Sequence, residues 1–201
     1  MESTDTLSDI EYSVREQLLL FTTIYVVSIE NSKSINSVIL GELRGSEDIH
    51  TYSHKINDRF ENTYVPISEV PITRRFINQA TKIANDIYGK NMRVLHTHRG
   101  KPIDGFWFNV MKSGDITGLH KHNKNAYLSS AYYLTVPEDS GNIVFREGGK
   151  EFEIKSMSGE LLIFPSQLSH KVLRSNSSQE RISMAMNFYT LPLVWEDDSG
   201  F

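Results

Sequence analysis

The sequence predicts a mainly β protein in which two sheets pack as a sandwich or jelly roll and α-helices brace one of them. Short apolar segments rich in β-branched and aromatic residues recur from about residue 92 onward, separated by turn sequences such as RGKP, KSGD, PEDSGN, EGG and SNSSQE. Helical patterns occur before that point. The 201 residues, 39% of them hydrophobic, suffice for one domain with its own core.

The first 66 residues contain one predicted helix between less regular segments. Residues 1 to about 16 lack periodicity and are expected to form a loose lead-in, whereas LLLFTTIYVVSI (18–29) is typical of one or two strands. Apolar residues at helical spacing predict a short helix over 31–45, ending at Gly45. The polar stretch 46–66 is expected to be an ordered loop of the kind that often carries function, here a lid facing the substrate.

The clearest helix is predicted from Pro71 to Tyr88. One face of it is apolar, and Gly89 can end it. The predicted strands that follow are MRVLHTH, GFWFNVMK, YLSSAYYLTV, NIVFRE, EFEIK, ELLIFP, HKVLRS and RISMAMNFY. We therefore expect a single domain over 1–201, in which a strand and helices within 1–91 brace a β core formed by 92–195.

Composition narrows the possible functions. The net charge of −4 does not favour nucleic acid or an anionic membrane as a partner. The sequence has no cysteine, so a metal site would use histidine, aspartate or glutamate, which suits iron, zinc or manganese. The acidic N-terminus does not resemble a secretory signal and no segment is long and apolar enough to span a membrane, so we expect an intracellular, cytoplasmic protein.

The segment GLHKHN (118–123) is the first candidate metal site. In an extended chain, residues i and i+2 point to the same face, so His120 and His122 could bind one ion. His170 begins a later strand, directly after the apolar segment LLIFPSQLS. His96 and His98 have the same spacing but no such distal partner, and we expect a structural or surface role for them, as for His50 and His54.

The last predicted strand, RISMAMNFY, combines a core face with a polar face. Alternation places Ile182, Met184, Met186 and Phe188 in the core, and Arg181, Ser183, Ala185 and Asn187 on the opposite face, toward a solvated cavity. A buried arginine there requires an anion, and its planar fork suits a carboxylate. The alternative is an ordinary strand arginine paired with a carboxylate near Glu180.

From Trp107 to Tyr189 the sequence resembles the 2-oxoglutarate/Fe(II)-dependent oxygenase superfamily. The motifs are HKHN, LSSAYYL, GELLIFPSQLSH and RISMAMNFY. Their pattern H-x-H-x(6)-S-x(2)-Y-Y-L is similar to that of a family of small 2-oxoglutarate/Fe(II) oxygenases of bacteria and their phages. The resemblance implies a double-stranded β-helix (jelly roll, cupin-like) with Fe(II) as the metal, 2-oxoglutarate as cosubstrate and O2 as oxidant.

The resemblance also implies roles for individual residues. His120 and His170 would bind the iron, and Arg181, Ser183 and Tyr133 would bind 2-oxoglutarate. His122 stands where most of the superfamily has Asp or Glu, so it is either a third metal ligand, which we favour, or an outer residue with water completing the coordination. Asn109 and Asn187 could line the pocket or be satisfied core amides, and Trp107 is expected in the core.

The leading functional hypothesis is a dioxygenase that hydroxylates a C–H bond and releases succinate and CO2. The first alternative is a cupin-like three-histidine metal enzyme that does not use 2-oxoglutarate, and the second is a β-sandwich binding module without catalysis. The strand RISMAMNF lacks the additional arginine usual in nucleic-acid demethylases, so a protein or peptide side chain is the preferred substrate. A small molecule remains open, and the oligomeric state is not predicted.

Overall fold

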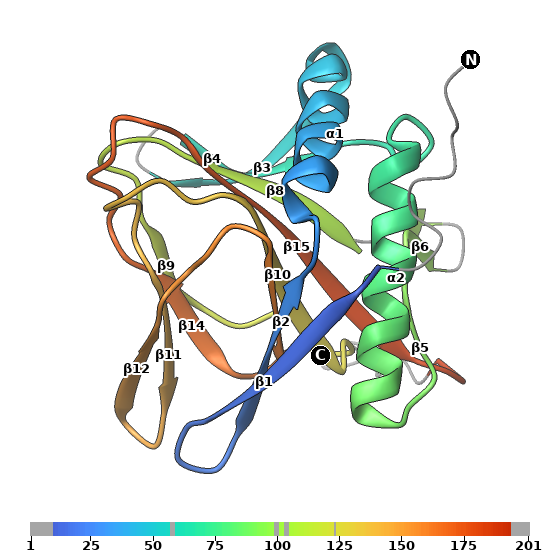
Figure 1. Ribbon diagram of the computed structural model, residues 1–201, viewed down its shortest axis with the longest axis vertical. Helices are drawn as coiled ribbons and strands as arrows, with labels where there is room; N and C mark the ends of the chain where they lie inside the picture. Colours follow the sequence, from blue (N-terminus) through green and yellow to red (C-terminus); the bar gives the residue numbers. More distant parts are fainter. Residues whose placement is uncertain (1–9, 57–58, 99–100, 103–104, 123, 194–201) are drawn as a thin grey trace, which may run out of the picture.

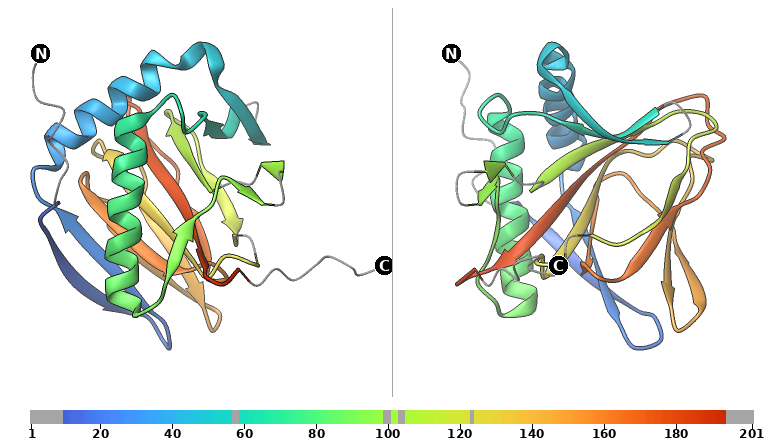
Figure 2. Two further views of the ribbon diagram at one scale, coloured as in Figure 1. Left: turned by 90° about the vertical axis from the view of Figure 1, so that its right-hand side faces the viewer. Right: turned by 180° about the vertical axis from the view of Figure 1, so that it is seen from behind.

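Two antiparallel β-sheets of unequal size face each other, and two helices cover the outer face of the larger one (Figures 1 and 2). This computed structural model describes residues 10–56, 59–98, 101–102, 105–122 and 124–193. The helices are α1 (Ser32–Gly45), the 3-10 helix η1 (Glu47–Ile49) and α2 (Pro71–Tyr88). The strands of the N-terminal half are β1 (Tyr12–Leu18), β2 (Thr23–Ile29), β3 (Thr51–Ile56), β4 (Arg59–Tyr64), β5 (Met92–Val94) and β6 (Thr97–His98). Those of the C-terminal half are β7 (Lys101–Pro102), β8 (Phe106–Met111), β9 (Thr117–His120), β10 (Leu128–Thr135), β11 (Ile143–Glu147), β12 (Lys150–Ile154), β13 (Glu160–Pro165), β14 (Ser169–Val172) and β15 (Arg181–Thr190).

The large sheet has the strand order β1-β2-β13-β10-β15-β8-β4-β3, and β5 pairs with one end of β15. The small sheet has the order β12-β11-β14-β9. Neighbours in both sheets are often distant in sequence, as β2 and β13 are. The strands β1–β5 and β8 all belong to the large sheet, and from β9 onward the chain passes back and forth between the two sheets. Residues from both halves of the sequence therefore line the space between them.

The helices pack on the outer face of the large sheet through the main hydrophobic core. The apolar face of α2 contributes Phe76, Ile77 and Ile83 to this core, and the even-numbered residues of β15 meet them from the sheet. Glu42 of α1 accepts hydrogen bonds from the first backbone N–H groups of α2, at 2.7 and 2.8 Å, which satisfies groups that a helix start leaves unpaired. The helices thus hold the large sheet from outside and leave its inner face for the site.

A second, smaller core joins the two sheets. It contains Tyr133, Phe145, Leu162 and Phe164, all 0 or 1% exposed. This core fills one part of the space between the sheets, and a cavity fills another. Among the helices that the structure describes, none has the length and apolar character needed to span a membrane.

Most predicted elements are confirmed, including the helix over Pro71–Tyr88, whose stop at Gly89 has the left-handed φ of 60°. Two predictions about the N-terminal part were wrong. Part of the lead-in, Tyr12–Leu18, is strand β1, which is exposed along its whole length and therefore carries no hydrophobic alternation. The stretch 46–66 is not a loop but η1 followed by the β3–β4 hairpin, which extends the large sheet beyond β8.

Candidate metal centre and adjoining cavity

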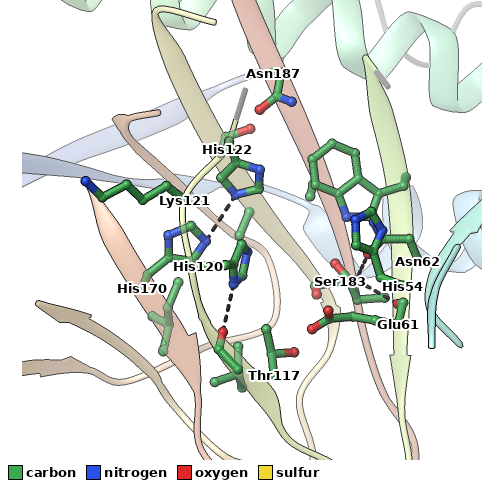
Figure 3. A pocket seen from close by; sticks show the side chains of 18 of the residues that line it. His54, Glu61, Asn62, Thr117, His120, Lys121, His122, His170, Ser183 and Asn187 are labelled. Atoms are coloured by element: carbon green, nitrogen blue, oxygen red, sulfur yellow. Dashed lines mark hydrogen bonds between the residues drawn. The ribbon is translucent and has the colours of Figure 1, made fainter. Parts of the chain in front are cut away.

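A cavity of about 710 Å³ lies between the two sheets. Strands of both sheets line it, and Figure 3 shows its two sides: histidines from the small sheet on one side, and residues of β4 and β3 on the other. Ser183 and Asn187 of β15 lie between them. The cavity therefore contains almost all the residues that the sequence singled out.

Three histidines, His120, His122 and His170, cluster on one side. Register pairs the last residue of β9, His120, with His170 of β14. His122 lies two residues beyond the end of β9, where its backbone N–H donates to the carbonyl of Ser166 at 3.0 Å. One ring nitrogen from each of the three lies within 4.8 Å of the others. The structure thus brings together the three residues predicted to bind the metal, although His122 reaches the group from a loop and not from a strand face.

Backbone carbonyls orient two of these imidazoles. The Nδ1 atom of His120 lies 2.8 Å from the carbonyl of Gly118, and that of His170 lies 3.0 Å from the carbonyl of Leu168. A carbonyl accepts only, so each Nδ1 carries the proton and each Nε2 keeps a lone pair. Metal-binding histidines are commonly fixed in this way through their second nitrogen.

Two of the three imidazoles, those of His122 and His170, are held in the neutral form. Burial, followed by the neighbouring His170 and His120, lowers the pKa of His122 to about 2. Burial also lowers the pKa of His170 to about 3, followed by the effect of His120, while the hydrogen bond to Leu168 acts in the opposite direction. Neutral imidazole is the form that binds metal ions, so His122 and His170 are prepared for a cation at ordinary pH.

The geometry of the cluster fits a transition-metal ion. The Nε2 atoms of His122 and His170 are 3.1 Å apart. Two nitrogens that each bind one ion at about 2.1 Å, at right angles, lie about 3 Å from each other. A face of three nitrogens would leave further positions open, as in iron oxygenases. Among the described residues, no Asp or Glu joins the three histidines.

Arg181 lies on β15, on another wall of the same cavity. It is 2% exposed, and among the described residues no carboxylate pairs with it. Its nearest polar contacts are the hydroxyl of Ser156 at 3.3 Å and the sulfur of Met111 at 3.6 Å, and its Nε has no hydrogen-bond partner. Burial lowers the pKa of this guanidinium. The pairing with a carboxylate near Glu180 is not seen, since Glu180 contacts Lys112 at 3.7 Å.

Two hydroxyls in the cavity wall are also unpartnered, and one of them lies beside Arg181. The Tyr133 ring lies 5.0 Å from its guanidinium, and the Tyr133 hydroxyl is buried without a hydrogen-bond partner. The hydroxyl of Ser130, also in the cavity wall, is unpartnered as well. Buried polar groups are nearly always paired, so the unpaired Nε of Arg181 and the unpaired hydroxyl of Tyr133 beside it point to a missing anionic ligand.

The predicted alternation of β15 and β10 agrees with these positions. Arg181, Ser183, Ala185 and Asn187 line the cavity, and the even-numbered residues of β15 lie in the helix-side core. Tyr132 points the other way, as expected, packing on Phe76 and donating to Asn36 at 2.6 Å.

Of the remaining residues singled out in the sequence, two asparagines border the cavity and one histidine lies outside the histidine cluster. Asn109 borders the cavity, and its amide donates to the backbone of Glu61 at 2.8 Å and to the side chain of Asn62 at 3.1 Å. Asn187 also borders it and accepts from Ser129 at 2.7 Å. His96 lies outside the histidine cluster and packs on Phe106, with its pKa lowered by burial; the side chain of His98 is outside the described part.

Sequence reasoning missed one side of the cavity. His54, Glu61 and Asn62 of the β3–β4 hairpin line it, in a stretch predicted to be a loop; His54 is exposed, as expected, and also borders the cavity. Trp107, expected in the core, also lines the cavity, with its ring 5.3 Å from that of His122. The available signal was the polar character of 46–66, but nothing in it indicated which residues would face inward.

Comparison with known proteins finds one matching family model and many solved structures of similar fold. The family model described as "Putative 2OG-Fe(II) oxygenase" matches residues 105–157 and 146–187, from β8 into β15. No curated protein matches the sequence closely enough to count as a relative.

Solved structures show the same fold at low identity. HygX from Streptomyces hygroscopicus, with nickel and 2-oxoglutarate bound, has 11% identity over 84% of this chain and 83% of its own, at a TM-score of 0.63. A Pseudomonas putida prolyl-4-hydroxylase has 14% identity, covering 92% of this chain and 96% of its own, at 0.58. A prolyl hydroxylase from Trichoplax adhaerens, in complex with a hypoxia inducible factor peptide fragment, has 14% identity and 83% coverage of both chains, at 0.62.

The comparisons confirm the resemblance and the fold. The structural neighbours are 2-oxoglutarate oxygenases with a double-stranded β-helix, which is the fold implied by the sequence motifs. The matching family and these neighbours are 2-oxoglutarate-dependent oxygenases, so the sequence match and the fold both agree with the predicted enzyme class and with Fe(II), 2-oxoglutarate and O2 as its cofactors.

Proposed function

We propose, from the premise that this chain has the sequence pattern and the fold of the 2OG-Fe(II) oxygenases, that it is an Fe(II)- and 2-oxoglutarate-dependent dioxygenase that hydroxylates a C–H bond. One observation carries the proposal: a buried arginine without an anion shares a cavity with three clustered histidines. A metal and a dicarboxylate together would satisfy both groups.

His120, His122 and His170 would hold the iron through their Nε2 atoms. Bound there with 2-oxoglutarate, iron(II) supplies oxidation by O2, in which one oxygen atom enters the substrate C–H bond and the other enters succinate as CO2 leaves. The carbonyls of Gly118 and Leu168 keep two of the imidazoles in the ligand tautomer. Three neutral ligands leave the site one charge more positive than the usual two histidines and a carboxylate.

Arg181 would bind the carboxylate of 2-oxoglutarate that lies away from the metal. Its guanidinium offers paired N–H donors, and the hydroxyls of Ser183 and Tyr133 can donate to the same anion. Apolar side chains of the wall, Ala131, Ile143 and Phe164, limit water around it. A dry setting strengthens the pairing and protects a reactive centre.

The three-histidine enzyme that does not use 2-oxoglutarate is the second candidate, and His122 in place of a carboxylate is the observation that favours it. It gives Arg181 no ligand, whereas 2-oxoglutarate explains Arg181 and the histidines together. For the substrate we retain a protein or peptide side chain as the preference, supported by the fold shared with the two prolyl hydroxylases.

The proposal is tested with anaerobically iron-loaded protein mixed with O2, ascorbate and 2-oxoglutarate, with succinate as the readout. Wild type should form succinate slowly without its substrate. His170→Ala and Arg181→Lys should lose about 90% or more of this signal, because lysine keeps the charge but not the fork. His96→Ala, which alters the other H-x-H pair, should keep it.

Metal content after dialysis separates the two roles of His122. If His122 is a ligand, His122→Ala should bind Mn(II) about tenfold or more weakly while His96→Ala matches wild type. Unchanged affinity in His122→Ala would assign it to the outer position. Absence of both 2-oxoglutarate binding and succinate in metal-loaded wild type would overturn the proposed function in favour of the three-histidine alternative.

A further inference from the structure

The β3–β4 hairpin forms a fixed wall of the cavity opposite the histidines. Arg59, at the start of β4, contacts Asp115 at 3.3 Å and donates to the carbonyls of Val110 and Ile116 at 2.9 and 3.1 Å. These contacts fasten the hairpin to the segment between β8 and β9. The hairpin is therefore part of the framework, and the side chains it presents to the cavity have defined positions.

Asn109 connects this wall to the strand that carries Arg181. It lies opposite Ser183 in the β8–β15 register, and its amide donates to the carbonyl of Glu61 and the side chain of Asn62. The backbone of Glu61 is thus held in place relative to β15. In Figure 3 the Glu61 side chain extends from β4 into the space between the hairpin and the strand of Thr117.

One oxygen of the Glu61 carboxylate lacks a partner in this position. Its Oε1 atom is shielded from solvent and has no hydrogen-bond partner among the described residues. Glu61 is also the only acidic residue among the described residues that line the cavity. A shielded carboxylate oxygen without a donor is unfavourable, and a cation with N–H donors is the ligand that compensates it best.

We propose that Glu61 recognises a cationic nitrogen group of the substrate, an ammonium or a guanidinium, and so holds the C–H bond to be oxidised in front of the histidine cluster. The inference rests on the proposed function and specifies its substrate class. Arg181, the buried cation of the cavity, would be occupied by 2-oxoglutarate. Two lysines also line the cavity: Lys55, on the same hairpin as Glu61, has a contact of its own, and Lys121 is exposed and points away from Glu61, past His170 (Figure 3).

The same chemistry occurs in a basic side chain of a peptide and in a free basic metabolite. The probes are therefore acetyl-Gly-Lys-Gly-amide and acetyl-Gly-Arg-Gly-amide for the first source, and free lysine, free arginine and agmatine for the second. Norleucine and citrulline replace lysine and arginine in neutral counterparts. Binding is measured by calorimetry on Mn(II)-loaded protein with saturating 2-oxoglutarate, under anaerobic conditions that prevent turnover.

Glu61→Gln removes the charge and keeps the shape, and Glu16→Gln is its control, since Glu16 lies exposed on β1 at the opposite edge of the sheet. At least one cationic probe should bind wild type and Glu16→Gln equally, and Glu61→Gln about tenfold or more weakly. The affinity of wild type for the neutral counterpart of that probe should be no higher than the affinity of Glu61→Gln for the cationic probe. Binding of the peptide probes would indicate a peptide substrate, and binding of the free amines would indicate a small metabolite.

The inference is overturned if no cationic probe binds, if cationic and neutral probes bind wild type equally, or if Glu61→Gln leaves the affinity unchanged. A loss of 2-oxoglutarate binding in Glu61→Gln would overturn it as well, because Glu61 would then serve the cosubstrate. Titration of 2-oxoglutarate into wild type is run in parallel. Failure of that titration alone contradicts the proposed function, while failure of the cation arm with 2-oxoglutarate bound contradicts only the role of Glu61.

Discussion

Arg59 and Arg181 approach the same end of β8 from opposite sides and have opposite surroundings. Arg59 of β4 pairs with Asp115 and donates to two carbonyls, including that of Val110 in β8. Arg181 of β15 is paired in register with Met111 of β8 and is more deeply buried. The groups recorded near its guanidinium are the Ser156 hydroxyl, the Met111 sulfur and the Tyr133 side chain, none of them an anion. One guanidinium is satisfied by the protein, and the other is not.

The difference separates framework from binding site. A polar group whose partners are all supplied by the chain stabilises the fold, and a buried polar group without partners costs stability that only a ligand can recover. Asn109 and Glu61 show the same contrast: the Asn109 amide has partners in the chain, including the backbone carbonyl of Glu61, whereas the Oε1 atom of the Glu61 side chain has none. Whether a polar group has partners within the chain therefore predicts whether its removal lowers or raises the stability of the unliganded protein.

The largest expected effect is on the unliganded protein. Arg59→Met should lower the free energy of unfolding by about 3 kcal/mol, since it leaves Asp115 and two carbonyls without a donor. Arg181→Met should raise it by about 1 kcal/mol, because an uncompensated buried charge is replaced by an apolar chain. Urea denaturation of metal-free protein measures both. Equal destabilisation by the two substitutions would remove the distinction.

A second experiment adds the ligand. With metal bound, 2-oxoglutarate at about a hundred times its dissociation constant should stabilise wild type by about 2.7 kcal/mol. Arg59→Met should gain the same increment from its lower baseline, and Arg181→Met should gain almost nothing. Thermal unfolding with and without the cosubstrate reports this increment, and an equal gain in Arg181→Met would place the 2-oxoglutarate site elsewhere.

The smallest effect is expected at Asn109. Asn109→Ala should cost about 1 kcal/mol of stability through its two lost hydrogen bonds. The affinity for 2-oxoglutarate should stay within about twofold of wild type, as measured by calorimetry. A large loss of that affinity would mean that Asn109 belongs to the cosubstrate site and not to the framework.

The parts of this site that the sequence predicted are those with strong periodicity or an ordered set of motifs. Alternation along β15 correctly separated Arg181 and Ser183 from the core residues, because that strand is buried on both faces and each face differs chemically. The helical stripe of α2 was predicted with its ends for a similar reason. His120 and His170 could be paired only through the family resemblance, since the strand register that joins them is a tertiary property.

The hairpin wall could not be predicted in the same way. β3 and β4 lie at the edge of the sheet and are largely polar, so no alternation marks them as strands. The roles of Glu61 and Trp107 depend on which way a side chain points after the sheets have packed. Composition described the segment correctly as polar, but its place in the cavity arises from Arg59 and Asn109, whose partners are distant in sequence.

The position of β9 gives the metal a structural role as well as a chemical one. This four-residue strand is an edge of the small sheet, joined to β14 alone and with an irregularity in the pairing. Two of the three imidazoles come from its end and the loop beyond it, and the third from β14. An ion held by all three would act as a clasp across that seam, joining positions 50 residues apart in the chain. Metal binding and the pairing of β9 with β14 would then be coupled, so that loss of the metal would weaken this pairing beside the cavity.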